Sequence, residues 1–263
     1  MSTDYHLHTP LCHHAAGHPR EYVAQARQRG LQEIGFADHN PMPVQYDNWR
    51  MSKDDLPRYV ELIGEARETG FPVRLGLECD YIPGYEGWIE QLSQLYPWDY
   101  LIGSVHYLSP GWDVDNPELV YKFDQVPVDE IWDLYWTNYV RCIRSGLFDF
   151  VAHPDLPKKF GHRPETDPRP AYERVIQALV DHDMAFELNT AGWRKAAGEQ
   201  YPAFDFLKMA ASAGVPVLVN SDAHAPEEVG AGFDQAYRLL REAGYRERIK
   251  FQGRRRFPVP LYE

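Results

Sequence analysis

Short apolar runs rich in β-branched and aromatic residues alternate along this chain with longer amphipathic segments, and no other feature restricts its fold as strongly. Runs of this length separated by helical patterns are typical of βα units, in which helices join parallel strands. Seven runs are predicted to be strands, at residues 4–8, 33–37, 73–78, 100–106, 148–153, 185–189 and 215–221.

The segments between these runs carry the end signals of helices. Pro19 suits a first helical turn and Gly30 suits the cap after the last turn, with Tyr22, Val23 and Ala26 on one face between them. Similar patterns predict helices at 54–68, 86–95, 128–145, 170–182, 203–213 and 231–243. The loops that follow strands, at 40–53, 109–127 and 155–168, would lie on the face of a βα barrel that carries active sites.

The chain has 263 residues and is expected to form a single domain, 1–263, because βα barrels commonly fill about 200–250 residues. No apolar run approaches the ~20 residues of a membrane span, so no membrane partner is expected. Three cysteines without a CxxC pair indicate a reducing, cytoplasmic location. The net charge of -12 disfavours nucleic acid as a partner, and the basic run 254–256 is expected to be a solvated tail. The oligomeric state is left open.

Side chains that bind metals stand where the predicted strands end. His6 and His8 are two residues apart at the end of the first run. Side chains two apart on a strand point the same way, so these two imidazoles are expected to share one space. Asp222 and His224, after the last run, would do the same if the strand geometry persists. Other runs end in residues of the same chemistry: Asp38 and His39, Glu78, His106, and His153.

Any one of these residues alone would be interpreted as a hydrogen-bonded core histidine or a capping acid. Together they would leave many polar groups at one end of the predicted barrel without partners, unless two or more cations bound to them. Imidazoles with a few carboxylates and no thiolate quartet suit Zn²⁺, Fe²⁺ or Mn²⁺ and do not suit Ca²⁺. The sequence therefore predicts a site for divalent transition metals.

These residues also carry a family resemblance. His6-Leu7-His8, Asp38-His39, Glu78, His106, His153 and Ser221-Asp222-Ala223-His224 resemble, in order, the motif set of the PHP (polymerase and histidinol phosphatase) superfamily. Within it, HTPLCHHAAGH, FADHNPMP, GSVHYL, HPDLPKKFGHR and ELNTAGWRK are similar to stretches of the monofunctional histidinol-phosphate phosphatases. The resemblance covers nearly the whole chain.

The resemblance implies an α/β fold, a distorted (β/α)7 TIM-like barrel of the PHP type, with three divalent transition-metal ions (Zn, Fe or Mn). By position, one ion would be held by His6, His8, Glu78 and Asp222, a second by Glu78, His106 and His153, and a third by His14, His39 and His224. His14 is chosen over His13 because the ligand in relatives follows the second strand histidine by six residues. Asp38 would orient an imidazole or a water.

The implied activity is hydrolysis of a small phosphomonoester, most specifically of L-histidinol phosphate to L-histidinol and phosphate in histidine biosynthesis. Divalent cations would lower the pKa of a bridging water, so that hydroxide attacks, and would neutralise the phosphate oxygens. The residues expected in catalysis are Asp38, Glu78, Asp222 and His224. Arg163 and Arg194 follow strands on the predicted active face and are candidates for binding the phosphate, ahead of Lys158 and Lys159.

Two further assignments concern loops near the predicted site. Asp47 and Trp49 lie in a loop that could cover the substrate, and they are candidates for contacting the amino alcohol and the imidazole. Cys12 is expected to have a packing role, because hydrolysis by activated water needs no protein nucleophile.

Three alternatives remain open. The first is a PHP phosphatase or phosphodiesterase that acts on another small phosphorylated metabolite or on a nucleotide. The second is an amidohydrolase-type enzyme, which also begins with HxH but would place lysine or glutamate at the fourth strand, where this chain has GSVH. The third is a metal-binding domain without catalysis, which is disfavoured because no expected ligand is missing.

Overall fold

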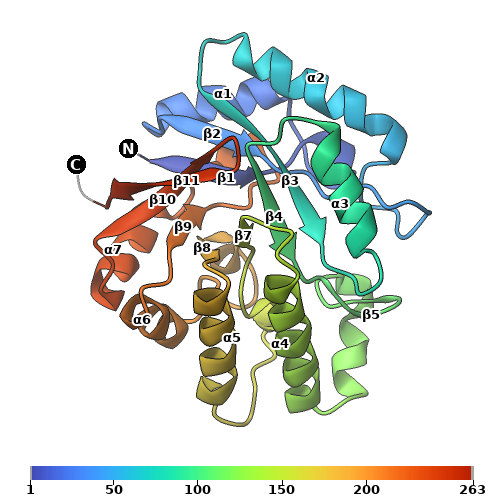
Figure 1. Cartoon of the computed structure of the whole chain (residues 1–263), viewed down its shortest axis with the longest axis vertical. Coiled ribbons are helices and arrows are strands. Elements are labelled where there is room, and N and C mark those ends of the chain that lie inside the picture. The colour runs from blue at the N-terminus through green and yellow to red at the C-terminus, as the bar shows by residue number, and fades with distance from the viewer. Residues whose placement is uncertain (1, 262–263) are drawn as a thin grey trace.

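The computed structural model describes residues 2–261. Parallel strands form one seven-stranded sheet with helices around it (Figure 1). In order across the sheet, the strands are β1 (Thr3–Leu7), β2 (Glu33–Phe36), β3 (Val73–Asp80), β4 (Tyr100–Ser104), β7 (Phe150–Val151), β8 (Ala185–Asn189) and β9 (Val217–Asn220). A parallel bridge between Leu7 and Ala223 links β1 to the residues after β9, so the sheet forms a nearly closed barrel. The predicted strands and the distorted barrel are confirmed.

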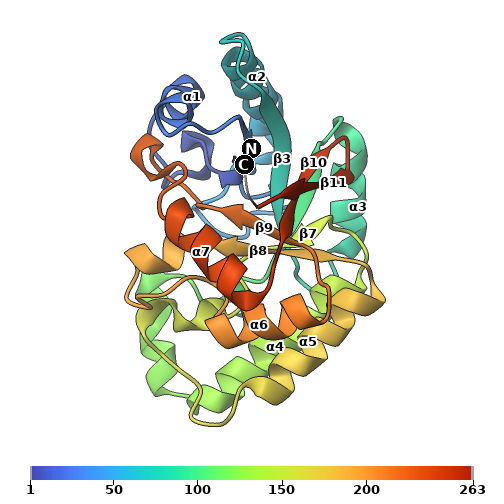
Figure 2. The same cartoon turned by 90° about the vertical axis from the view of Figure 1, so that its left-hand side faces the viewer.

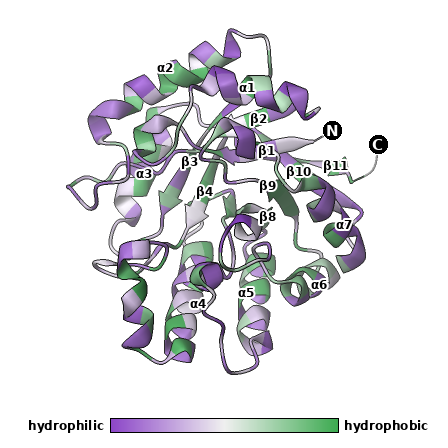
Figure 3. Ribbon diagram, turned by 180° about the vertical axis from the view of Figure 1, so that it is seen from behind, coloured by the Kyte–Doolittle hydropathy of each residue, from purple (hydrophilic) through white to green (hydrophobic). Residues whose placement is uncertain are grey.

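One α-helix follows each barrel strand, as predicted. The helices are α1 (Pro19–Gln28), α2 (Leu56–Arg67), α3 (Glu86–Leu95), α4 (Val128–Arg144), α5 (Arg169–Asp181), α6 (Phe204–Ser212) and α7 (Phe233–Ala243). The predicted apolar face of α1 is buried. Hydrophilic and hydrophobic stripes run along the helices (Figure 3), as expected for helices that cover a barrel on one side and meet water on the other.

The connections from the strands to the helices contain short elements of their own. These are the 3-10 turns η1 (Pro10–Cys12), η2 (Lys53–Asp55), η3 (Pro117–Asp124), η4 (Leu156–Phe160), η5 (Ala191–Arg194) and η6 (Pro226–Glu228), and the antiparallel pair β5 (Tyr107–Ser109) and β6 (Trp112–Asp113). All of them follow the carboxyl ends of barrel strands, where the sequence predicts the active face.

Large side chains fill the interior of the barrel. Tyr5, Tyr100 and Phe150 are fully buried there, and the rings of Tyr5 and Tyr100 lie 5.2 Å apart. Gly76 on β3 makes room for this packing, because a Cβ at that position would lie 2.1 Å from the Tyr100 ring. The barrel is therefore a packed core and not a channel.

A hairpin closes the end of the barrel opposite the strand-to-helix connections. It consists of β10 (Glu247–Gln252) and β11 (Arg255–Pro260), and it lies beside β9 (Figure 2). Ile249 and Phe251 are buried against the barrel core, with the Phe251 ring 5.6 Å from that of Phe150. The backbone N–H of Gly253 donates to the carboxylate of Asp99, which directly precedes β4, so the hairpin meets the amino ends of the strands.

The expectation of a solvated basic tail is therefore wrong. Arg254 donates to the carboxylate of Asp149 at 2.8 Å, and Arg256 donates to the backbone carbonyl of Asp183 at 2.7 Å. The sequence pattern of short alternating apolar residues in 247–260 was too weak to indicate that this segment packs on the barrel. Among residues 2–261, none of the helices is both long enough and apolar enough to cross a membrane.

Candidate metal centre

Imidazoles and carboxylates from several strands meet at the carboxyl ends of the barrel, as the sequence predicts. Glu78, at the end of β3, lies in the middle of this group. One oxygen of its carboxylate, Oε2, lies 3.2 Å from Nε2 of His6 and 2.9 Å from Nδ1 of His39. The other oxygen, Oε1, lies 3.1 Å from Nε2 of His153 and 3.7 Å from Nε2 of His106. One carboxylate thus lies close to an imidazole from β1 and to imidazoles that follow β2, β4 and β7.

Asp222 faces the same group from the residues after β9. Its Oδ1 lies 3.3 Å from Nε2 of His8 and 3.8 Å from Nε2 of His6. The strand geometry does not persist to this point, because β9 ends at Asn220 and Asp222 has a left-handed backbone with φ 52°. Asp222 and His224 nevertheless converge, with Oδ1 of Asp222 3.6 Å from Nδ1 of His224, so their proximity comes from a turn and not from strand alternation.

His14, and not His13, joins this group. The ring of His14 lies 4.6 Å from that of His224 and 5.3 Å from that of His39. His13 has a left-handed backbone with φ 63° directly after η1, and its Nδ1 lies 2.9 Å from the backbone oxygen of Asn48. The turn at His13 is what directs the next side chain back toward the barrel.

Several polar atoms of this group are buried and make no hydrogen bond of proper geometry within residues 2–261, although some of them lie close to one another. Because an unpaired buried polar atom is costly, a cluster of them facing one space indicates a group that the protein atoms alone do not supply. The atoms are Nε2 of His6, both ring nitrogens of His8, Nδ1 of His39, Oε2 of Glu78 and Nε2 of His224. Nitrogen and carboxylate oxygen are the donors that divalent transition metals bind, so the residues fit such ions.

Glu78, His39 and His224 have charges that fit cation binding. Burial raises the pKa of the Glu78 carboxyl, but the imidazoles of His6 and His39 lower it to well below its usual range. Burial lowers the pKa of His39 to about 3, and burial together with the neighbouring His8 lowers that of His224 well below its ordinary value. Burial also lowers the pKa of His6 and His106, but the carboxylates of Glu187 and Asp80 raise it above the ordinary value, for His106 to about 10. These imidazoles would therefore release a proton on binding an ion, since a metal binds the neutral imidazole.

Several sets of three donors lie close enough to hold an ion. In each set, one donor atom from every residue lies within 4.8 Å of the others. The sets are His6, His8 and Asp222; His39, Glu78 and His106; His8, His39 and His224; Cys12, His14 and His224; and His8, Cys12 and Asp38. The first is part of one predicted ligand set, whereas the second joins Glu78 and His106 with His39, which the sequence assigns to a different ion.

Residues behind the cluster hold its imidazoles in place. Nδ1 of His106 lies 2.7 Å from Oδ1 of Asp80, and Nδ1 of His6 lies 3.1 Å from both oxygens of Glu187. Such carboxylate partners fix the orientation of a metal-binding imidazole. Neither residue is among those predicted from the sequence, although Asp80 follows Glu78 by two positions on one strand and so shares its face by the same alternation that relates His6 and His8.

Asp38 lies behind the cluster, as its predicted supporting role requires. Its carboxylate accepts hydrogen bonds from the backbone N–H and the hydroxyl of Thr9, and its Oδ1 lies 3.6 Å from Nδ1 of His8. The carboxylate therefore ties the first residue after His8 to the end of β2.

A cavity of about 170 Å³ opens onto the cluster. Besides the residues of the cluster, its lining includes Asp115, Lys159, Lys195 and Tyr201. Nζ of Lys159 lies 2.5 Å from Oδ1 of Asp115. Two cations and one further acid thus surround the space in front of the imidazoles.

The predicted phosphate-binding arginines lie outside this lining, as far as residues 2–261 define it. Arg163 pairs with Glu199 and donates to the backbone oxygen of Ala197 at 2.8 Å. Arg194 pairs with Glu228 at 3.1 Å and donates to the backbone oxygen of Ser221 at 2.8 Å.

Lys158, the weaker alternative, is buried in a structural position. Its ammonium group donates to Asp155 at 2.9 Å, to Glu199 at 2.8 Å and to the backbone oxygen of Gln200 at 2.7 Å. Lys158 therefore joins two loops, while its neighbour Lys159 reaches the cavity.

The loop 40–53 packs beside the cluster around a buried arginine. Arg50 donates to Asp47 at 2.6 Å and to Asp80 at 2.8 Å, and its guanidinium lies 4.5 Å from the centre of the Trp49 ring. Trp49 in turn meets the ring of His39 edge-on at 4.5 Å. Asp47 is thus held by Arg50 and does not line the cavity, so its predicted contact with the amino alcohol is not what this arrangement favours.

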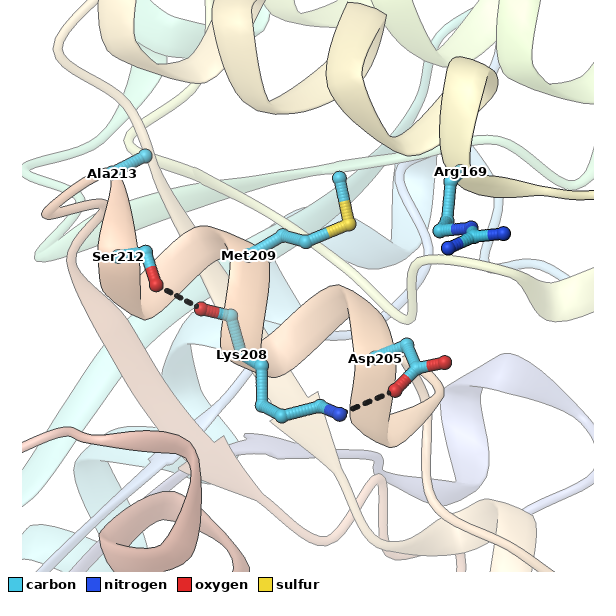
Figure 4. A pocket seen from close by; sticks show the side chains of 6 residues that line it. All are labelled: Arg169, Asp205, Lys208, Met209, Ser212 and Ala213. Atoms are coloured by element: carbon cyan, nitrogen blue, oxygen red, sulfur yellow. Dashed lines mark hydrogen bonds and ion pairs between the residues drawn. The ribbon is translucent and has the colours of Figure 1, made fainter.

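A larger hollow of about 690 Å³ lies elsewhere, between the start of α5 and helix α6 (Figure 4). The polar groups that line it have partners within the protein: Nζ of Lys208 lies 2.7 Å from Asp205, the hydroxyl of Ser212 donates to the backbone oxygen of Lys208 at 2.9 Å, and Arg169 pairs with Asp167 at 2.8 Å. Size alone therefore does not mark a site, and the smaller cavity with unpartnered donors is the better candidate.

A barrel with imidazoles and carboxylates gathered at the carboxyl ends of its strands places the protein among the barrel hydrolases that use divalent metals. Comparison with known proteins gives the family. Residues 4–191 match the PHP domain, and the chain belongs to the PHP domain family.

Several relatives match this chain over most of its length. The chain is 44% identical over 260 residues to a probable histidinol-phosphatase from Deinococcus radiodurans, with 97% of this chain and 98% of the relative covered. It is 27% identical to a probable phosphatase from Shewanella oneidensis, with 92% of this chain and 83% of the relative covered. The fold resembles the crystal structure of histidinol phosphate phosphatase from Lactococcus lactis complexed with Zn, L-histidinol and phosphate, with TM-score 0.83, 23% identity, and 97% and 98% of the two chains covered.

Proposed function

We propose that this protein is a histidinol-phosphatase, which hydrolyses L-histidinol phosphate to L-histidinol and phosphate. One observation carries the proposal: buried, unpartnered imidazole nitrogens and carboxylates converge on a cavity at the carboxyl ends of the barrel strands. The probable histidinol-phosphatase from Deinococcus radiodurans, which is 44% identical over nearly the full length of the chain, supports this substrate.

The residues of the cluster are proposed to hold divalent cations such as Zn²⁺, Fe²⁺ or Mn²⁺. The proposed ligands are those predicted from the sequence: His6, His8, His14, His39, Glu78, His106, His153, Asp222 and His224. The chemistry that such cations supply is the activation of water and the neutralisation of phosphate oxygens. Glu78 contacts imidazoles on both of its oxygens, so it is the residue best placed to be shared between ions.

The cavity supplies contacts that fit the two ends of the substrate. The ammonium groups of Lys159 and Lys195 would attract the phosphate, and the carboxylate of Asp115 would attract the amino group of histidinol. Asp115 and Lys159 already pair at 2.5 Å, so a zwitterionic substrate would exchange this pair for two new ones. The proposed roles of Arg163 and Arg194 in binding phosphate stay predictions, because both residues pair with acids outside the cavity lining, although Nη1 of Arg194 is buried and has no hydrogen-bond partner within residues 2–261.

Asp38, Glu78, Asp222 and His224 remain the residues proposed to act in catalysis. Asp38 holds Thr9 and faces His8, so its effect would be exerted through the position of that imidazole. The whole chain, 1–263, is proposed to act as one domain, since the hairpin near one terminus closes the barrel that the strand near the other terminus begins. We also propose a cytoplasmic location, which the three free, buried cysteines support.

The test is phosphate release from L-histidinol phosphate by protein that has been stripped of metal and then reloaded separately with Zn²⁺, Mn²⁺ or Fe²⁺. The expected result is turnover that depends on the added metal and that is lost again with a chelator. Turnover that is equal with and without metal would contradict the proposal.

A second candidate is a phosphatase for another small phosphomonoester, which the relative described only as a probable phosphatase favours. A panel of phosphorylated metabolites and nucleotides decides between the two. Histidinol phosphate should have the highest kcat/KM, and Asp115→Asn should lower kcat/KM for amino-bearing substrates more than for phosphomonoesters without an amine. A higher kcat/KM for another member of the panel would replace histidinol phosphate as the substrate.

A further inference from the structure

Cys12 lies inside the group of imidazoles and not in the apolar core. It is the last residue of η1 and is fully buried. Its sulfur, a nitrogen of His14 and a nitrogen of His224 lie within 4.8 Å of one another, and the sulfur also lies within this distance of donors from His8 and Asp38. In contrast, Cys79 and Cys142 belong to the hydrophobic cluster between the barrel and its helices.

The local backbone brings this sulfur to its position. Thr9 caps η1, with its hydroxyl accepting from the N–H of Leu11, and the same hydroxyl donates to Asp38. The backbone N–H of His13 donates to the carbonyl of Pro10 at 3.0 Å, and the left-handed turn at His13 follows. Cys12 and His14, on either side of this turn, therefore face the barrel together.

Unpartnered imidazole nitrogens point to a ligand in this same space. Both ring nitrogens of His8, which is fully buried, and Nε2 of His224 make no hydrogen bond of proper geometry in the described part of the chain, although Oδ1 of Asp222 lies 3.3 Å from Nε2 of His8. The rings of His8 and His224 stack with their centroids 4.1 Å apart. Three aromatic nitrogen bases and one sulfur crowd around a space where a cation would satisfy all of them at once.

We propose that the thiolate of Cys12 is a ligand of the ion held by His14 and His224. This inference rests on the proposed metal centre and adds to it a sulfur donor where the sequence pattern offers only imidazoles. The ion at this position would then have a nitrogen and sulfur donor set, while its neighbours have nitrogen and oxygen donors. Thiolate favours softer ions, so this position should prefer Zn²⁺ to Mn²⁺.

The test uses the full chain loaded with Co²⁺, because a thiolate bound to Co²⁺ gives a charge-transfer absorption in the near ultraviolet that nitrogen and oxygen ligands do not give. The wild-type protein is expected to show this band, and Cys12→Ser to lose it while the total of bound ions falls by at most one per chain. Cys142→Ala, which removes a core thiol, is the control and should keep the band. The affinity for the ion at this position should fall roughly 10–100-fold in Cys12→Ser.

X-ray absorption of the Zn-loaded wild-type protein tests the same contact without a variant. A zinc–sulfur distance of about 2.3 Å is expected in addition to the shorter distances to nitrogen and oxygen. Bound zinc with nitrogen and oxygen neighbours alone, and no charge-transfer band in the Co²⁺ protein, would overturn the role of Cys12 and leave the metal centre standing. A protein that binds neither Zn²⁺ nor Co²⁺ would overturn the metal centre itself.

Discussion

Glu187 is a buried carboxylate behind the metal centre, and its replacement by glutamine tests how the cluster is held. Its Oε1 accepts from the backbone N–H of His153 at 2.9 Å and from the amide of Asn189 at 2.7 Å, and its Oε2 accepts from the amide of Asn220 at 2.7 Å. Both oxygens lie 3.1 Å from Nδ1 of His6. In Glu187→Gln, one of these oxygens becomes an NH₂ group that faces donors only.

The size of the effect follows from the bonds that are lost. Either Asn220 or the pair formed by His153 and Asn189 loses its acceptor, and a buried hydrogen bond to a charged group contributes about 1.5–3 kcal/mol. We expect the metal-free protein to lose roughly 2–4 kcal/mol of unfolding free energy, which for a chain of this size corresponds to roughly 5–10 °C in Tm. Loss of the carboxylate behind His6 should also weaken metal binding about 10–100-fold.

Two measurements check this prediction. Calorimetry of the metal-free protein gives the change in Tm, and titration with Zn²⁺ in competition with a chromophoric chelator gives the affinity. Glu90→Gln, on the exposed face of α3, is the matched control and should change neither quantity. If Glu187→Gln binds Zn²⁺ as tightly as the wild type, then Glu187 does not orient His6 for metal binding and the reasoning is refuted.

Four further predictions concern other parts of the molecule. His106→Ala should lose bound metal, measured by elemental analysis, and nearly all phosphate release; retention of both would remove His106 from the mechanism. Gly76→Ala should lower the unfolding free energy, measured with urea, by about 1–3 kcal/mol, because its Cβ would meet Tyr100. Gly64→Ala, which has open space around it in α2, is the control and should not destabilise the protein. Equal effects of the two substitutions would argue against the close approach of Gly76 and Tyr100. Arg50→Met should lower the unfolding free energy by about 3–5 kcal/mol, since it removes the guanidinium that pairs with the buried Asp47 and Asp80. Arg58→Met, at an exposed position, should change the unfolding free energy little. Similar unfolding curves for the two variants would count against a structural role for Arg50. Chelation of metal should lower Tm, since ions that bind only the native state stabilise it, and an unchanged Tm at saturating chelator would speak against cations bound to the folded protein.

Much of the fold and of the candidate site could be predicted from the sequence, because the strands are apolar runs and the cluster residues stand at their ends. His6 and His8 follow strand alternation, and the structure places them together with Glu78 as expected. Asp80, the last residue of β3, could have been predicted from its spacing of two from Glu78, whereas Glu187 lies inside β8, where a carboxylate is not marked as different from any other polar residue. Only the barrel shows that both side chains point toward the imidazoles.

The contacts of the loops could not be predicted, because they depend on which distant groups come close. Arg163 and Arg194 follow strands on the active face, but Glu199 and Glu228 lie within reach and pair with them. No local pattern separates an arginine that pairs with a neighbouring acid from one that is free for a ligand. The same holds for the hairpin 247–260, in which Ile249 and Phe251 are buried only because the barrel leaves one end open to them.

The packed interior of the barrel limits the route by which small molecules reach the metal centre. Tyr5, Tyr100 and Phe150 leave no passage through the barrel, and Phe251 closes its far end. Substrate and both products must therefore enter and leave through the opening of the cavity at the carboxyl ends of the strands. Inorganic phosphate added from outside would enter by the same route and should compete with the substrate for the cavity.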